Sequence, residues 1–500
     1  MYPKKTQQNT QPKEFQLPFG GKLAADNRWV ILAQIIPWTE LEGEYAAKFE
    51  LDLGAPAKTF RMAMGALIIK EKLGISDRET VEQIRENPYL QYFIGMSEYS
   101  NKAPFDPSMM VHFRERIDIN LVNKLNQEIV RKALFIEEEV EVKTKKSEGE
   151  DSKNEVKNQG KLILDASCAP ADITYPTDLG LLNRSRKHTE RIIDILYKNL
   201  AVKTIAKPRT YRQIARKKYL EIAKRKRPTI LQRRSAIKKQ LQYISRNLGH
   251  IQQLIDQGAS LLELSKREYK ILLVISEVYR QQLWLYENKK RKIEDRIVSI
   301  SQPHIRPIVR GKVAKNTEFG AKFSASCFNG YVFLDNISWN NFNESGDFKS
   351  QVEAYKSFTG YYPESVHVDK IYRTRENRAW CKQRGIRISG PPLGRPPKDI
   401  SQETKKQARV DEAIRNSIEG KFGQGKRRFS LNKIMAKLPH TSLTSIAISF
   451  LVMNLSTLLL RLLWGFLCLF FRITPFFDDL INKVDYLVVF RQRKLIFTPA

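Results

Sequence analysis

Two short apolar segments that each end on an aspartate are the strongest constraint on the fold of this 500-residue chain. Residues 161–167 read Lys-Leu-Ile-Leu-Asp-Ala-Ser, and residues 365–369 read Ser-Val-His-Val-Asp. Both have the composition of buried β-strands that deliver a carboxylate to a sheet edge. A single strand-end aspartate is more often a turn or helix cap than a functional group. A partly buried carboxylate nevertheless needs an ion pair, hydrogen bonds or a metal, so its surroundings decide its role.

The sequence around these segments predicts a mixed α/β sheet. We expect strands at 319–326, 331–335, 365–369 and 386–388, and helices at 348–358, 373–384 and 409–428. Asn329-Gly330 is a strong hairpin signal between the first two of these strands. In such a sheet the strand that begins at Lys161 can lie beside 365–369. Asp165 and Asp369 would then face each other.

A strongly basic insertion separates the two segments. Between Lys203 and Lys239 there are fifteen Lys or Arg residues and one acid, Glu221. Apolar residues at heptad spacing then predict helices over 237–255 and 272–286, joined at 256–260 as an antiparallel hairpin. A solvated charged face is the ordinary explanation of a charge run. A run of nearly one sign favours phosphate contact instead.

Composition supports a nucleic-acid partner and an intracellular setting. The formal net charge is +32 and the pI is about 9.8, which predicts a polyanionic partner rather than a small metabolite. The four cysteines are far apart and lack metal-ligand spacing, so we expect reduced thiols and a cytosolic protein. The polar first 16 residues predict no secretory signal.

Residues 27–136 predict a helical domain. Helices are expected at 28–36, 58–72, 77–87 and 107–133, with Ser76 and Glu79 as a capping start. Short helices with tight turns could form a helix-turn-helix that reads DNA ends, or an ordinary helical bundle. A polar tail, 1–26, precedes this domain, and a charged flexible linker, 137–160, follows it.

The segment 409–428 supplies a third acid. A continuous helix would place Arg415, Glu419 and Lys426 on one face. Glycines at 420, 423 and 425 weaken that helix, by about 1 kcal/mol each relative to alanine. They indicate close approach to DNA or to the sheet, with a helix C-cap at Gly420 as the alternative.

The apolar run 446–471 is long enough to span a membrane. Polar residues interrupt it, among them Asn454 and Arg461. A central arginine costs about 2.5–3.5 kcal/mol on insertion scales. We therefore expect a buried helix that closes the mixed α/β domain, with membrane association as the alternative.

Three stretches resemble the DDE transposases of bacterial insertion sequences, in the insertion-sequence-four and -five group: 162–183, 367–398 and 418–438. The helical segment 58–118 is similar to the N-terminal domain of that group. The resemblance implies a ribonuclease H-like α/β (α+β) fold, with an inserted helical hairpin and an N-terminal all-helical domain. It divides the chain into the helical DNA-binding domain at 27–136, a split catalytic domain at 161–184 and 310–445, the insertion at 185–309 and a C-terminal apolar helix and tail at 446–500.

The resemblance also implies a function and its residues. Asp165, Asp369 and Glu419 would bind Mg2+ or Mn2+, as two ions, for cleavage and strand transfer at DNA phosphodiesters. The family motif places a tyrosine where this chain has Glu412. The implied partners are double-stranded DNA and a second subunit on that DNA, in the bacterial cytoplasm at the nucleoid. An inactive, transposase-derived DNA-binding protein is the alternative function. The expected DNA or phosphate contacts are Arg415, Lys426, Arg427, Arg428, Lys224, Arg225, Lys226, Arg227, Arg233 and Arg234.

Overall fold

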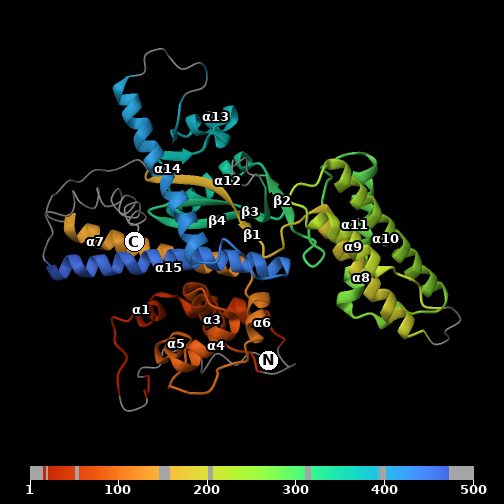
Figure 1. The fold of residues 1–500 in the computed structure, drawn as a ribbon. Coiled ribbons are helices and arrows are strands. Elements are labelled where there is room, and N and C mark those ends of the chain that lie inside the picture. Colours follow the sequence, from red (N-terminus) through yellow and green to blue (C-terminus); the bar gives the residue numbers. More distant parts are fainter. Residues whose placement is uncertain are drawn as a thin grey trace, which may run out of the picture. The chain divides into compact units, whose positions relative to one another are not determined.

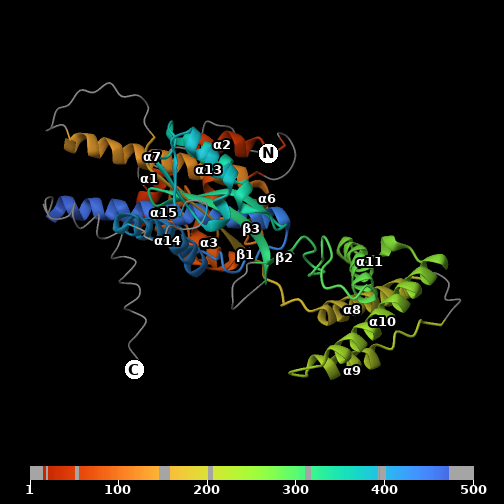
Figure 2. The same cartoon turned by 90° about the horizontal axis from the view of Figure 1, so that it is seen from above.

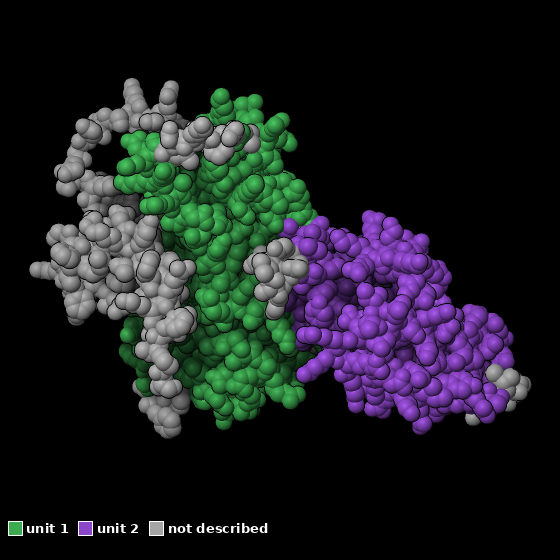
Figure 3. Space-filling model, turned by 45° about the horizontal axis from the view of Figure 1, so that its top comes forward, with its two compact units in different colours: residues 1–169, 323–337, 342–500 green, residues 170–322, 338–341 purple. Residues whose placement is uncertain are grey.

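The computed structural model combines a mixed β-sheet with many helices, so the expected α/β class is confirmed (Figure 1). It describes residues 15–17, 21–50, 56–145, 158–200, 206–309, 317–391, 394 and 401–471. Two compact units result: unit 1 comprises 1–169, 323–337 and 342–500, and unit 2 comprises 170–322 and 338–341 (Figure 3).

Helices fill the N-terminal part of unit 1, as expected. Ser76 caps one of them, because its Oγ accepts a hydrogen bond from the Glu79 amide at 3.1 Å. The expected helix 107–133 is two helices that break at Ile117 and Asp118, and two short helices were not expected, α2 and α5. The elements are α1 (Arg28–Ile35), α2 (Trp38–Ala46), α3 (Phe60–Leu73), α4 (Asp77–Glu86), α5 (Pro88–Phe93), α6 (Met109–Arg116) and α7 (Ile119–Lys145).

The mixed sheet contains the expected strands, and β1 lies beside β5 as expected. Its strands follow the order β2-β3-β1-β5-β6, and β4 pairs with β3. Asn329 and Gly330 both have positive φ, as a tight two-residue hairpin turn requires. The short strand β2 was not expected. The strands are β1 (Lys161–Pro170), β2 (Arg306–Val309), β3 (Thr317–Phe328), β4 (Tyr331–Ser338), β5 (Ser365–Val368) and β6 (Arg387–Ile388).

Helices α12 (Phe348–Thr359), α13 (Arg375–Gln383) and α14 (Gln402–Arg428) follow the expected pattern, although α14 begins earlier than predicted. This helix is continuous through all three glycines, so the C-cap at Gly420 is wrong. A Cβ at Gly425 would lie 3.0 Å from Met453 Sδ, which shows that this glycine allows α14 to approach a neighbouring helix rather than the sheet or DNA. Phe422 anchors α14 on the sheet, with its ring 5.4 Å from that of Phe323.

That neighbouring helix is α15 (Pro439–Phe471), the apolar segment, and it is largely buried within unit 1. It runs beside α7 and also contacts α3 and α6 (Figures 1 and 2). Asn454 is fully buried, and its side chain exchanges hydrogen bonds of 2.8 and 2.7 Å with the Val332 backbone. Arg461 donates to the carbonyl of Asn329 at 2.5 Å, in the β3–β4 turn.

By length and composition, α15 is the one helix in the described part of the chain that could cross a membrane, over Pro439–Leu463. Two of its polar residues, Asn454 and Arg461, form hydrogen bonds with other groups inside the protein. The expectation of a buried helix is therefore consistent with these contacts. The chain beyond residue 471 lies outside the described residues.

Unit 2 contains the predicted helical hairpin, α10 (Ile230–Asp256) and α11 (Lys266–Glu287), but two further helices complete it. These are α8 (Asp178–Lys198) and α9 (Arg212–Ala223), and α8 packs extensively against α10 (Figure 2). Leu182 and Ile193 of α8 are buried with apolar residues of α10 and α11. The insertion is thus a four-helix unit rather than a hairpin.

The two compact units do not coincide with the expected domain ranges, which stay a prediction. The expected insertion boundary at residue 185 falls inside α8, whereas unit 2 begins at Pro170. The N-terminal helices and most of the sheet, expected in separate domains, belong to one compact unit, whereas β2 and residues 317–322 of β3 belong to unit 2. The expected linker is partly helical, because α7 continues to Lys145; residues 146–157 lie outside the described residues.

Candidate active site

Asp165 and Asp369 lie on neighbouring parallel strands. Strand β1 pairs with β5 in a register that places Leu164 beside Val368, and the two aspartates follow immediately. Adjacent strands are about 4.8 Å apart, so the two backbones deliver their carboxylates to one place on the sheet. Asp165 is half-buried and Asp369 is exposed. The expectation that the two aspartates face each other rests on this register.

An ion-pair network fixes the helix that carries the third acid. Arg387 of β6 makes two hydrogen bonds to the Asp411 carboxylate of α14, both of 2.8 Å. His367 of β5 is fully buried, and its Nδ1 lies 3.6 Å from Asp411 Oδ1. Burial lowers the pKa of His367 to about 4, so this imidazole is neutral at pH 7. The network holds α14 against β5 and β6, two helical turns before Glu419.

Glu419 is exposed and is held by Arg415 of the same helix. Arg415 Nη1 donates to Glu419 Oε1 at 2.9 Å, and Nη2 donates to Glu412 Oε1 at 2.7 Å. Glu412, at the family's tyrosine position, is therefore an ion-pair partner of Arg415. The hydrogen bond from Arg415 lowers the pKa of Glu412. Both glutamates compete with any DNA phosphate for this guanidinium.

Electrostatics connect Asp165 to Glu419 and to one further acid. Burial, together with the charges of Glu344 and Glu419, raises the pKa of Asp165 to about 6. A hydrogen bond of 2.8 Å from the Ala166 amide and the charge of Arg415 act in the opposite direction. The site thus concentrates negative charge around a carboxylate that is poorly solvated.

The other predicted phosphate-binding residues of α14 lie in its last turn. Arg427 and Arg428 are exposed, whereas Lys426 is half-buried. Arg427 lies against Gly423, where an added Cβ would approach its guanidinium within 3.2 Å. Cations in the last turn of a helix are favoured by its dipole. Arg427 and Arg428 are therefore accessible to a phosphate.

Carboxylates are suitable ligands for a divalent cation, but the three acids do not form a group that could hold one. Hard carboxylate oxygens suit Mg2+ and Mn2+. A cation beside Asp165 would offset the acidic charges that raise its pKa. Within the described ranges, however, no three His, Cys, Asp or Glu side chains form a group that could hold a metal ion. The Glu419 carboxylate is engaged by Arg415, and this contact separates it from such an arrangement.

In unit 2, the predicted basic residues have two different environments. Lys224, Arg225, Lys226 and Arg227 are exposed in the turn between α9 and α10, and Arg233 is exposed on α10. Arg234 instead stacks on the Tyr286 ring at 4.2 Å and donates to the Tyr286 carbonyl at 2.8 Å. This arginine therefore ties α10 to α11.

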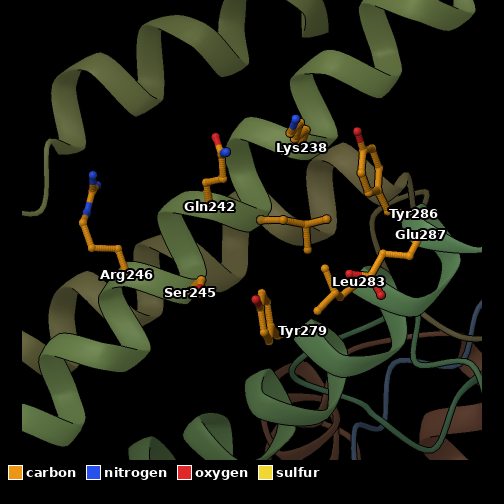
Figure 4. Close-up of a pocket in the computed structure, with 9 residues that line it drawn as sticks. Lys238, Gln242, Ser245, Arg246, Tyr279, Leu283, Tyr286 and Glu287 are labelled. Carbon is orange, nitrogen blue, oxygen red and sulfur yellow. The ribbon is translucent and has the colours of Figure 1, made fainter.

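A groove between α10 and α11 presents Arg246, a cation outside the basic run at 203–239, beside Lys238 of that run. It measures about 430 Å³, and Lys238, Arg246, Tyr279 and Tyr286 are among its lining residues (Figure 4). Arg246 lies over the rings of Tyr211 and Tyr243, at 4.7 and 5.2 Å from their centres. Tyr211 precedes α9, so this arrangement depends on the fold of the unit. Sequence periodicity alone gave no signal for it.

Two transposase families match the chain. The family described as "Transposase DDE domain" matches residues 366–456, a range that includes Asp369 and Glu419, and the family described as "Transposase domain (DUF772)" matches residues 18–116. A protein of Rhizobium meliloti described as "Uncharacterized protein ORF8 in nfe locus" is 31% identical over 149 residues, which is 30% of this chain and 64% of that protein. No solved structure matches.

These findings define the class of protein. An N-terminal transposase domain and a DDE domain lie on one chain, and the mixed sheet places two acids on adjacent strands. The resemblance is confirmed: the two regions match transposase families, which is consistent with a DDE transposase of insertion sequences.

Proposed function

We propose that this protein is an insertion-sequence transposase that binds the terminal inverted repeats of its element and catalyses metal-dependent DNA cleavage and strand transfer. The single observation that carries this proposal is the β1–β5 register, because it brings Asp165 and Asp369 together across 204 residues (369 − 165). DDE transposases generally use divalent metal ions. Here the proposed cofactor is Mg2+ or Mn2+, as two ions, with Asp165, Asp369 and Glu419 as ligands.

The bound ions would lower the cost of the charge that develops on the attacking and leaving oxygens of an in-line displacement. The chain's own residues then orient the DNA. Arg415 donates to Glu419 through Nη1 and to Glu412 through Nε and Nη2, so a phosphate that replaces Glu419 would accept the hydrogen bond from Nη1. Release of Glu419 from Arg415 would free its carboxylate for the metal.

DNA outside the active site would contact the basic surfaces of both units. Exposed Arg427 and Arg428 extend the charge of α14, and Lys224–Arg227 and Arg233 form the basic surface of unit 2. Phosphate contacts position DNA but carry no sequence information. Recognition of the inverted repeats is therefore assigned to the N-terminal helices. We further propose a homodimer that holds two element ends, in the cytoplasm at the nucleoid and without membrane insertion.

The test is cleavage of DNA that carries the inverted repeats flanking the coding region. Asp165→Asn, Asp369→Asn and Glu419→Gln should each reduce Mg2+-dependent cleavage by about 1000-fold, which corresponds to about 4 kcal/mol of transition-state stabilisation. DNA binding should persist in all three. Glu403→Gln, an exposed acid in the first turn of the same helix as Glu419, serves as the matched control and should cleave normally.

Normal cleavage by any of the three variants would disprove the assigned triad. A second function is favoured by the observation that the three acids do not form a metal-binding group among the described residues. Salt-sensitive DNA binding by the wild type without any metal-dependent nicking would establish that alternative, a non-catalytic DNA-binding protein. A DNA complex with the mass of a single subunit would contradict the dimer.

A further inference from the structure

Two adjacent apolar side chains are exposed at the start of α10 in unit 2. Ile230 is 75% exposed and Leu231 is 78% exposed, so neither side chain belongs to the core of the unit. A single exposed aliphatic side chain is ordinary on a protein surface, whereas neighbouring ones form a patch. A partner that covers this pair would remove its apolar surface from water, which is favourable.

The backbone holds the pair in a fixed orientation. Thr229, the residue before it, forms a capping box with Gln232: the Thr229 Oγ1 accepts from the Gln232 amide at 3.2 Å, and the Gln232 Oε1 accepts from the Thr229 amide at 3.1 Å. Arg234, one turn into the helix, donates to the Tyr286 carbonyl of α11 at 2.8 Å. The pair therefore begins a helix that is anchored at its start.

Exposed cations flank the pair on both sides. The run 224–227 ends three residues before Ile230, and Arg233 lies two residues after Leu231. No acidic residue occurs between positions 222 and 255 of the sequence. Among the residues that the structure describes, none forms an ion pair with these five cations. The surface around the pair is therefore positively charged and lacks counter-charges of its own.

This combination of charge and apolar surface selects the partner. A second copy of the same surface is disfavoured, because cations would then face cations. A polyanion complements the charge, and DNA is the polyanion on which the proposed activity takes place; both matched families are transposase families. Proteins that bind the minor groove hold phosphates with cations and insert side chains such as Ile or Leu between base steps, which kinks the duplex.

We propose that Ile230 and Leu231 form an apolar wedge that enters the minor groove of bound DNA and opens one base step, while the cations at 224–227 and Arg233 bind phosphates beside it. The proposal rests on the proposed function in one respect, since its partner is the DNA that the protein binds. It gives unit 2 a role beyond charge neutralisation, which is to deform the duplex. The acids of the active site take no part in it.

The test separates DNA bending from DNA binding in the full-length protein. The DNA is a duplex that carries the inverted repeats, with a donor and an acceptor dye at its two ends. The wild type should raise the energy transfer between the dyes, whereas the double variant Ile230→Ala/Leu231→Ala should leave it close to that of free DNA. The slope of log binding constant against log salt concentration should be unchanged, because the variant removes no phosphate contact.

A second measurement locates the opened base step. The fluorescence of 2-aminopurine, placed at successive positions along the duplex, rises where the base loses its stacking. The wild type should raise it at one step, and the double variant should lose this increase. Because both wedge residues are exposed, the double variant should unfold at the wild-type temperature, which excludes misfolding as the cause of the loss.

Leu262→Ala is the matched control. Leu262 is 93% exposed in the short turn η3 (Leu261–Glu263), which follows α10 and lies beyond the opposite end of that helix from the wedge. This variant removes a similar exposed aliphatic side chain from the same unit. It should bend DNA and raise the 2-aminopurine fluorescence as the wild type does.

The outcomes distinguish the wedge from the proposed function. An unchanged bend and fluorescence increase in the double variant would overturn the wedge and leave DNA binding and cleavage standing, and so would a wild type that binds DNA without bending it. A wild type that binds no DNA would contradict the proposed function as well. Binding to phosphatidylglycerol vesicles that is lost in the double variant, with DNA bending unchanged, would assign the pair to an anionic lipid surface instead.

Discussion

Asp165 is in its charged form at neutral pH although the fold withdraws it from water and surrounds it with acids. Its pKa in the folded protein is about 6, against 3.8 for an unperturbed aspartate. For a carboxyl with a raised pKa, the folded state is favoured while the group is protonated. That advantage is present below about pH 4 and disappears as the pH rises to about 6, after which the charged group destabilises the fold by a constant amount.

We therefore expect Asp165→Asn to stabilise the metal-free protein at pH 7.5 by about 1–3 kcal/mol and to have almost no effect at pH 4. Chemical denaturation of both proteins at the two pH values measures this difference. Added Mn2+ at pH 7.5 should stabilise the wild type and leave the variant unchanged. A variant that is less stable than the wild type at pH 7.5 would contradict the proposed electrostatic cost.

At the same scale, the sequence identified the aspartates but not their neighbours. Asp165 and Asp369 each end a recognisable strand, so the local pattern was sufficient to select them. Glu344 follows an irregular polar stretch, and nothing in its surroundings distinguishes it from a turn residue. The turn that contains it, residues 344–346, packs against the turn 370–372 that follows Asp369, which is a tertiary contact between separate segments.

Among the elements, α14 shows how glycines can have opposite roles in one helix. Gly425 is buried, and a Cβ there would lie 3.0 Å from Met453 Sδ and 3.1 Å from Leu431 Cδ2. Gly420 is exposed, and a Cβ there would have no neighbour within 4 Å among the described residues. The sequence shows only that both positions are glycines within a helical pattern.

We expect Gly425→Ala to destabilise the protein by about 1–3 kcal/mol, because the added methyl group overpacks the contact between α14 and α15. Gly420→Ala should instead stabilise it by about 0.5–1 kcal/mol through helix propensity. Urea denaturation of the two single variants measures both effects. Equal changes of the same sign would show that helix propensity, rather than close packing, governs both positions.

At the scale of the whole molecule, the net charge of +32 makes DNA binding depend on salt. The sequence contains two exposed runs of four cations in unit 2, at 224–227 and 289–292. The first lies in the densest basic region, which we expect to bind DNA. The second has the same charge and serves as a matched comparison within the same unit.

Replacing all four cations at 224–227 by glutamine should make the slope of log binding constant against log salt concentration shallower, by about 0.9 for each DNA phosphate that the variant leaves unneutralised. The same replacement at 289–292 should change the slope less. Fluorescence anisotropy with a DNA duplex between 50 and 300 mM salt, roughly the range in which such slopes are resolved, measures both. Equal slopes for the two variants would show that net charge, rather than the turn at 224–227, determines the binding.

Local pattern was sufficient for most elements of this protein and for its class. Apolar alternation, heptad spacing and the Asn329-Gly330 turn predicted most strands and several long helices, because each depends on residues close in sequence. They did not predict the long helix α8 or the helix α9. The helices α2 and α5 and the strand β2 are short, and short elements carry too little periodicity to be recognised. The transposase resemblance followed from stretches at both ends of the chain.

Only the tertiary structure decided which segments meet. The β1–β5 register joins Asp165 to Asp369, and the Arg387–Asp411 network places α14 on the sheet. The Asn377 side chain links two turns by donating to the carbonyls of Ser345 and Tyr372. The tertiary structure also gives polar residues of α15 hydrogen-bond partners inside the protein, whereas the sequence alone was compatible with a membrane-spanning helix. The physical reason is common to all of these. Hydrogen bonds, ion pairs and burial join residues that are distant in sequence, and no local pattern encodes such pairs.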